Sequence, residues 1–222
     1  MKLNPVNNVP SGLTKRAQGF VAMHGMKVDV QPVEERTRWW RTRGIPASVI
    51  DRMAAYQQRW GGLFLPPAPA YQGGPKYFDS DAPEGSSSEG WWFEAGDPRV
   101  SVPYLFMIGP AGEFGIYGDG RWTGLHMTVE GWVESVALAH HASLWAKQIT
   151  KVTGDDVDHL ALEGFQPVQE VKGLADTWWR GTDTLIAVYS GPPEYSGPRR
   201  TALIYSGLDQ WGLRGGVSDS DD

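Results

Sequence analysis

The stretch YLFMIGPAGEFGIYGDGRWTGLHMTVEGWVESVALAHHA, residues 104–142, determines which fold the chain can adopt. It contains two short apolar runs, 104–108 and 113–117, that are separated by a Gly-Pro-Ala-Gly turn, and this pattern predicts a β-hairpin. After a second glycine-rich turn, Thr128 stands where a helix N-cap is expected, with Glu130 in the first turn. An amphipathic helix is therefore predicted from Thr128 to about residue 142. Because one hairpin and one helix cannot bury a core alone, the flanking sequence must supply more strands and helices.

Helical and strand patterns are present on both sides of this stretch. Of the two helices predicted before it, one has acidic residues at its start and arginines at its end, and the other has a proline in its first turn and a glycine pair after it. Apolar segments between turn residues predict strands, the last two of which should pair as an antiparallel hairpin. The predicted helices are 33–43 and 46–60, and the predicted strands are 63–65, 177–180, 184–190 and 201–206. We therefore expect an α+β fold, a mainly antiparallel sheet flanked by helices, in a single domain with a C-terminal β-rich extension.

Composition divides the chain into a folded body with two less ordered ends. Residues 1–31 are rich in Asn, Pro, Gly and Gln, and are expected to form a loosely ordered arm in which only 20–26 can pack. The folded domain is expected at 32–214, with its core at 44–145 and the β-rich extension at 150–214. Residues 215–222, GGVSDSDD, are expected to be a flexible acidic tail.

Charge and cysteine content restrict the possible partners. The 222-residue chain has 20 Lys and Arg against 26 Asp and Glu, a formal charge of -6, which disfavours nonspecific attraction to nucleic acid or an anionic membrane and favours a basic partner. With Cys at 0 there is no disulfide, thiolate zinc site or cysteine nucleophile. The first residues lack the apolar core of a secretory signal, and no apolar run is long enough to span a bilayer. A cytoplasmic location is therefore the expectation.

No catalytic or cofactor-binding pattern stands out. The glycines of 109–120 lack the GK[ST] ending of a phosphate-binding loop, and there is no GxSxG motif. His140 and His141 are adjacent on the predicted helix and point in different directions, so they do not form the i, i+4 pair of a helical zinc site. His126 could meet Asp155 or Glu130 in space, although the spacing does not require it. We therefore expect no cofactor, no metal and no enzymatic activity.

The predicted loop at 66–98 is the strongest candidate for a functional surface. It is long and rich in Pro, Gly and Ser, and it has no basic residue between Lys76 and Arg99. Long loops inside compact domains are often functional, and aromatic residues among carboxylates suit docking of a basic protein. A solvated loop whose tryptophans simply pack on the sheet explains the pattern equally well. If the loop binds a partner, the expected contact residues are Asp79, Asp81, Glu89, Trp91, Trp92 and Glu94.

The order of these features resembles the SUKH superfamily. The resemblance rests on a helix that opens IPASVIDRM and closes on Gly61 and Gly62, a long variable loop, the segment PYLFMIGPAGEFGIYGDG, and a helix that opens TVEGWVESVALAHHA. It covers roughly residues 44–145, and the C-terminal β-rich part looks like the extension of longer members. The resemblance implies an α+β fold with a mainly antiparallel sheet packed against helices.

That superfamily includes immunity proteins of bacterial polymorphic toxin systems and a yeast regulator of cell-wall synthesis. The resemblance implies a non-catalytic protein that binds a cognate toxin domain in the cytoplasm and blocks its active site, and the charge of the chain suits a basic toxin. It supplies no catalytic residues to carry over. Two other possibilities stay open: a regulatory scaffold that binds several host proteins, and an enzyme of another kind.

Overall fold

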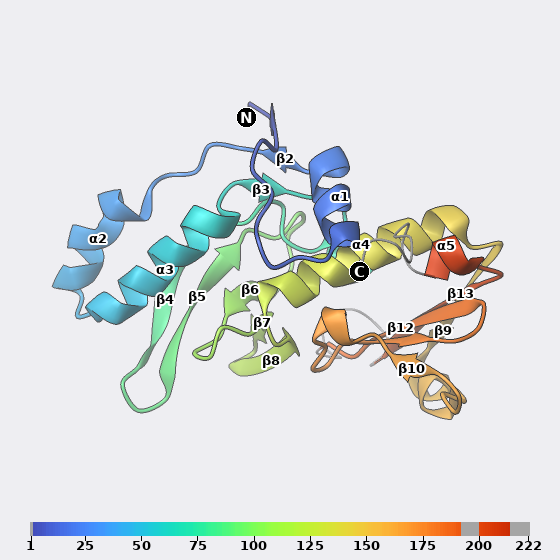
Figure 1. Ribbon diagram of the computed structural model, residues 1–222. Coiled ribbons are helices and arrows are strands. Elements are labelled where there is room, and N and C mark those ends of the chain that lie inside the picture. Colours follow the sequence, from blue (N-terminus) through green and yellow to red (C-terminus); the bar gives the residue numbers. More distant parts are fainter. Residues whose placement is uncertain (1, 192–199, 214–222) are drawn as a thin grey trace.

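The computed structural model of the chain describes residues 2–191 and 200–213. Within these ranges the protein has an α+β fold built from antiparallel sheets and helices, as predicted. Figure 1 shows the long helix α4 (Val129–Trp145) running from the first large sheet to the C-terminal sheet. The predicted acidic tail at 215–222 lies outside the described residues, as do 192–199 in the connection between the last two strands.

The described strands form three antiparallel sheets with orders β1-β2-β3, β4-β5-β6-β7-β8 and β10-β11-β12-β13-β9. The strands are β1 Asn4–Pro5, β2 Met26–Lys27, β3 Leu63–Phe64, β4 Asp81–Ser86, β5 Gly90–Gly96, β6 Leu105–Ile108, β7 Phe114–Gly118, β8 Arg121–His126, β9 Gln148–Thr153, β10 Gln166–Pro167, β11 Thr177–Arg180, β12 Thr184–Tyr189 and β13 Thr201–Ser206. The other helices are α1 Lys15–His24, α2 Val33–Thr42, α3 Ala47–Trp60 and α5 Gln210–Leu213, with 3₁₀ turns η1 Tyr71–Gly73, η2 Gly154–His159 and η3 Gln169–Val171.

The hairpin and the helix predicted in the stretch 104–142 both form, but the helix is not amphipathic, because residues 131–139 are all buried. β6 and β7 pair as an antiparallel hairpin in which Phe106 is opposite Ile116, and both side chains are fully buried. Thr128 caps α4, because its side chain accepts a hydrogen bond from the backbone N–H of Gly131 at 3.3 Å. The segment between the hairpin and the helix also forms a strand, β8, and α4 continues to Trp145, past the predicted end. The predicted helices at 33–43 and 46–60 are α2 and α3.

The prediction of a long loop at 66–98 is wrong for most of its second half. β4 and β5 form an antiparallel hairpin there. β5 pairs with β6 in the sheet β4-β5-β6-β7-β8, which we call the central sheet. β4 has few β-favouring residues and contains Pro83, which is tolerated because β4 is an edge strand. β4 forms because it pairs with β5, and the propensities of its own residues do not reveal this pairing.

The prediction of a loosely ordered arm at 1–31 is also wrong. Residues 15–24 form α1, which is capped by Thr14 and packs against α4. Ala17, Phe20 and Val21 of α1 are buried in the hydrophobic core. β1 and β2 then add to β3 in a separate small sheet, so the strand predicted at 63–65 is confirmed but does not join the central sheet.

Helix α4 packs against both large sheets. On the first, the Trp132 ring lies 4.8 Å from the Phe114 ring, measured between centroids. On the second, Ser135 accepts a hydrogen bond from the Trp178 indole at 2.9 Å, and Trp178 stacks on Tyr205. One cluster of buried residues contains all four aromatic side chains, so the two sheets share a hydrophobic core. The predicted strands at 177–180, 184–190 and 201–206 are β11, β12 and β13, and β12 pairs with β13 as expected.

Candidate protein-binding surface

The β4–β5 hairpin places several of the predicted contact residues on one face. Asp81 is opposite Glu94, and Glu84 is opposite Trp92. Residues directly opposite in an antiparallel pair point to the same side of the sheet, as do residues two apart in one strand. The intervening Phe93 is buried in the core, so these four side chains lie on the outer face of the sheet. We call Asp81, Glu84, Trp92 and Glu94 the acidic hairpin face.

Carboxylates crowd each other on this face. The pKa of the half-buried Glu94 is raised from 4.5 to about 7, mainly because burial disfavours its charged form. The neighbouring carboxylates Asp81, Asp97 and Glu84 raise the pKa of Glu94 further, whereas Arg36 lowers it. Arg36 forms a 2.7 Å ion pair with Asp81, so it offsets the repulsion only in part. A cation brought by a partner would relieve the rest of this repulsion.

Trp122 covers part of the outer face of the central sheet next to the hairpin. Trp122 lies over Gly109 of the turn and Gly115 of β7. A Cβ on Gly115 would come within 2.6 Å of the Trp122 ring. Met107 is opposite both Glu94 and Gly115, and it is only 1% exposed although it belongs to neither hydrophobic core cluster. Large side chains therefore cover this part of the outer face. The acidic hairpin face thus adjoins the partly exposed Trp122, and aromatic side chains beside polar ones are common at protein interfaces.

The other predicted contact residues have different roles. Asp79 accepts a hydrogen bond from the Gln57 side chain at 2.9 Å, and so connects the hairpin to α3. Trp91 packs against the hydrophobic core. Glu89 is exposed at the tip of the hairpin, where its carboxylate accepts a hydrogen bond from Ser86. Only Asp81, Trp92 and Glu94 of the predicted set share the outer face, and Glu84 is the residue that the prediction missed.

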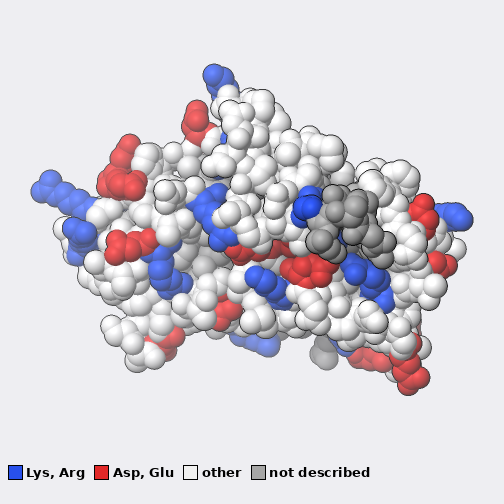
Figure 2. Space-filling model, in the orientation of Figure 1, with Lys and Arg blue, Asp and Glu red and all other residues white. Residues whose placement is uncertain are grey.

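Charge on the rest of the surface is mixed. Figure 2 shows acidic and basic side chains side by side over the visible face of the molecule, without one large patch of either sign. The formal charge of -6 is therefore not by itself an argument for this surface. The argument rests on the local crowding of carboxylates around Glu94.

This crowding can be measured directly. We expect Asp81→Asn to lower the pKa of Glu94 from about 7 by about one unit, because the substitution removes one neighbouring negative charge and leaves Arg36 without its ion pair to Asp81. The pKa is read from the side-chain carboxyl ¹³C shift of Glu94 in a pH titration. Glu163→Gln, an exposed acid beyond β9, is the matched control and should leave the Glu94 titration unchanged. A Glu94 pKa near 4.5 in the unaltered protein would contradict the crowding.

His126 meets neither Asp155 nor Glu130 but Asp176. His126 Nε2 lies 3.8 Å from Asp176 Oδ2, and both side chains are fully buried. The other ring nitrogen, Nδ1, is 2.9 Å from the carbonyl oxygen of Val171. Because a carbonyl only accepts, Nδ1 carries the proton and Nε2 is left as an acceptor. Sequence reasoning did not find this pair, since residues 126 and 176 lie in segments that only the fold brings together.

Asp176 also belongs to a network that joins distant segments. Its Oδ1 accepts hydrogen bonds from the Tyr71 hydroxyl at 2.5 Å and from the Ser190 N–H at 3.0 Å. Burial raises the pKa of Asp176 to about 7 and lowers that of His126 to about 4. Between these values the pair is neutral, and a protonated Oδ2 faces the unprotonated Nε2. The network connects η1, β8 and the end of β12, and the side chains of Tyr71, His126 and Asp176 are buried.

Two further features bear on function. Among residues 2–191 and 200–213, no three or more His, Asp and Glu side chains are placed to hold a metal ion. Over the same ranges, none of the helices combines the length and apolar character that crossing a membrane requires. Comparison of the chain with protein-family models, with curated proteins and with solved structures finds no match in any of the three.

Proposed function

We propose that this chain is a non-catalytic immunity protein, which binds a basic toxin domain in the cytoplasm and neutralises it. The observation that carries the proposal is the acidic hairpin face, where burial and then the charges of Asp81, Asp97 and Glu84 raise the pKa of Glu94 to about 7. Opposite charges on the toxin would relieve this repulsion on binding. The resemblance of residues 44–145 to the SUKH superfamily supplies the biological role.

The position of the surface suits rapid capture. β4 is the outermost strand of the central sheet, so the acidic hairpin face lies at the edge of that sheet, where Arg36 of α2 pairs with Asp81. Complementary charges speed encounter and select the correct partner more than they add affinity. The neighbouring aromatic surface of Trp92 and Trp122 would then supply the apolar contact that holds the complex.

A charge-reversal experiment tests the proposal. We expect the double variant Glu84→Lys, Glu94→Lys to weaken toxin binding by about 100-fold or more, mostly through a lower association rate at low salt. The toxin domain is taken from a gene adjacent to this one, or identified by capture from the native host. Binding is measured by surface plasmon resonance, and protection by co-expression with the toxin. The control Asp155→Lys, Asp156→Lys changes the net charge by the same amount in η2 and should retain both.

The outcomes distinguish the proposed toxin-binding surface from a regulatory scaffold. Loss of binding and protection in the hairpin variant, with both retained in the η2 variant, supports the proposed surface. If the hairpin variant folds and still protects, the surface is wrong. Capture of several unrelated host proteins, with no toxin among them, would favour a regulatory scaffold instead.

A further inference from the structure

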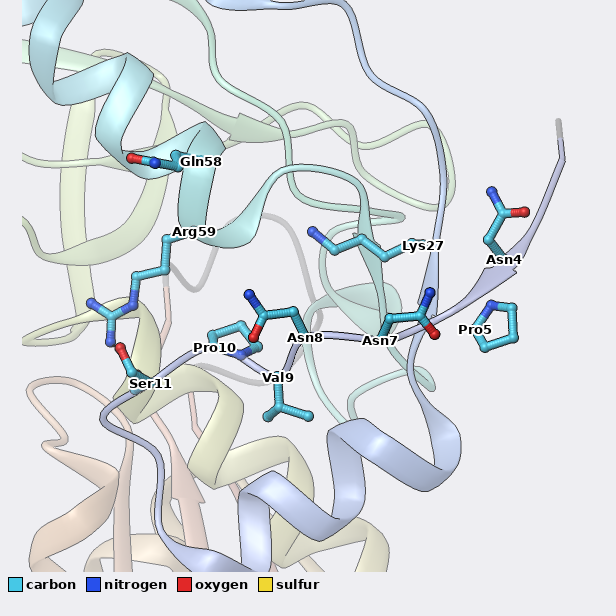
Figure 3. A pocket seen from close by; sticks show the side chains of 10 residues that line it. All are labelled: Asn4, Pro5, Asn7, Asn8, Val9, Pro10, Ser11, Lys27, Gln58 and Arg59. Carbon is cyan, nitrogen blue, oxygen red and sulfur yellow. Dashed lines mark hydrogen bonds between the residues drawn. The ribbon is translucent and has the colours of Figure 1, made fainter.

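The N-terminal segment covers a hollow of about 570 Å³ that is separate from the acidic hairpin face. Figure 3 shows that its walls come from residues 4–11, from β2 and from the end of α3. The volume is in the range of small-molecule sites. Among the residues that the structure describes, two cationic side chains, Lys27 and Arg59, line it together with amide and hydroxyl groups, and no Asp or Glu does so. In a chain with a formal charge of -6, this is a local reversal of sign.

Lys27 is the side chain that points to a ligand. Its ammonium donates a hydrogen bond to the carbonyl oxygen of Gly61 at 2.5 Å, at the C-terminal end of α3. Burial lowers the pKa of Lys27. In the part of the chain that the structure describes, Lys27 forms no ion pair. An ammonium has three donors, so two remain for an oxyanion, which would also supply the missing counter-charge.

Arg59 contributes less free charge to the hollow. Its guanidinium forms an ion pair with Glu130 and donates to the carbonyl oxygen of Ser11. These contacts fix the N-terminal segment against α3 and α4. Arg59 therefore shapes the wall opposite Lys27, and Lys27 supplies the uncompensated positive charge.

Amide side chains determine the rest of the ligand chemistry. Among the residues that the structure describes, Asn7, Asn8 and Gln58 line the hollow without a side-chain hydrogen bond. Figure 3 shows the Asn8 amide and the Lys27 ammonium directed toward the same space. Amides both donate and accept, which suits hydroxyl groups. Over residues 2–191 and 200–213, no Phe, Tyr or Trp lines the hollow, so a nucleobase would find no ring there on which to stack.

We infer that this hollow binds a small phosphorylated polyol, such as a sugar phosphate, with the phosphate at Lys27 and the hydroxyl groups at Asn8 and its neighbouring amides. Bare phosphate would leave most of the volume and the amides unused. An unphosphorylated sugar would leave the Lys27 charge without a partner. The inference does not depend on the proposed toxin binding, because the acidic hairpin face contributes no residue to this hollow.

Calorimetric titration with glucose 6-phosphate, ribose 5-phosphate and glycerol 3-phosphate tests the inference, with glucose and inorganic phosphate as reference ligands. We expect at least one sugar phosphate to bind more tightly than both references. Lys27→Met should weaken that binding by about tenfold or more, and Asn8→Ala by a smaller factor. Lys151→Met, which removes an exposed lysine from β9, should bind as the unaltered protein does.

The Asn8 variant keeps the test decisive if loss of the Lys27 contact to α3 unfolds the chain, because the Asn8 side chain forms no hydrogen bond to the other described residues. Thermal unfolding of each variant without ligand is the check on folding. The inference is overturned if none of the three sugar phosphates binds. It is overturned equally if inorganic phosphate binds as tightly as they do, or if the folded Asn8 variant binds them unchanged.

Discussion

Glu134→Ala is expected to lower the free energy of unfolding by about 3–5 kcal/mol. Glu134 lies in α4 with 2% of its side chain exposed, and it forms a 2.7 Å ion pair with the equally buried Arg16 of α1. Its carboxylate also accepts hydrogen bonds from the backbone N–H of Thr14 at 2.6 Å and from the Thr14 hydroxyl at 2.9 Å. Removal of this carboxylate leaves a buried guanidinium and two donors at the start of α1 without their acceptor. Glu170, at 3.6 Å from Arg16, compensates only in part.

Urea unfolding followed by tryptophan fluorescence measures this loss, and Glu163→Ala is the control for removal of an exposed glutamate. The double variant Arg16→Met, Glu134→Leu should recover much of the lost stability, because a buried ion pair can be replaced by apolar residues at little cost whereas a half-removed pair cannot. Amide exchange in Glu134→Ala should show α1 opening before α4. A loss below about 1 kcal/mol would mean that the pair behaves like a surface ion pair and that α1 is held mainly by Phe20 and Val21.

The contact between Arg16 and Glu134 also explains why residues 1–31 were expected to form a loosely ordered arm. α1 contains a local signal, since Ala17, Phe20 and Val21 follow helical spacing after Thr14, a good N-cap. Polar residues around them made that signal weak. The decisive partner, Glu134, lies 118 residues away from Arg16, and a single sequence does not show which distant residues meet.

The elements that were predicted correctly are specified by residues that lie within them or next to them in the sequence. The glycine turn at 109–112 closes the β6–β7 hairpin, and Thr128 begins α4 by capping its own backbone. By contrast, β4 and β9 form because β5 and β13 offer free edges. None of their residues is buried, so they lack the apolar pattern that would have marked them as strands.

The candidate surface was predictable in composition but not in arrangement. The sequence placed acids and tryptophans together in one segment, which is why Asp81, Trp92 and Glu94 were named as contacts. The register of β4 on β5 decides which of them share a face. It brings Glu84 opposite Trp92, and the connection to α3 removes Asp79 from the surface. The register is fixed only when the two strands pair, so the residues of the segment alone could not predict it.

Asp176→Asn is expected to stabilise the protein in alkaline solution and to change its stability little in mild acid. The pKa of Asp176 is raised from 3.8 to about 7 in the folded protein, so the folded state holds a proton that the unfolded state has already released between these values. The stability contributed by this group is therefore full below about pH 4 and decreases as pH rises to about 7. An asparagine cannot ionise, but its oxygen can still accept the hydrogen bonds from Tyr71 and Ser190.

The measurement is the free energy of unfolding of the variant minus that of the unaltered protein, from urea denaturation at pH 5 and pH 9. Titration of His126, whose pKa is lowered to about 4, removes stability as the pH falls below 6.5, but it does so in both proteins and largely cancels in the difference. We expect the difference to grow by a few kcal/mol in favour of the variant, at about 1.4 kcal/mol per pH unit through the titration.

Asp155→Asn controls for loss of a surface carboxylate. Asp176→Ala should be destabilised at both pH values, because it leaves Tyr71 and Ser190 without an acceptor, and this separates the role of the charge from that of the hydrogen bonds. A difference between Asp176→Asn and the unaltered protein that does not change with pH would mean that Asp176 is ionised in the folded interior throughout. In that case, the neutral pairing of Asp176 with His126 would be wrong.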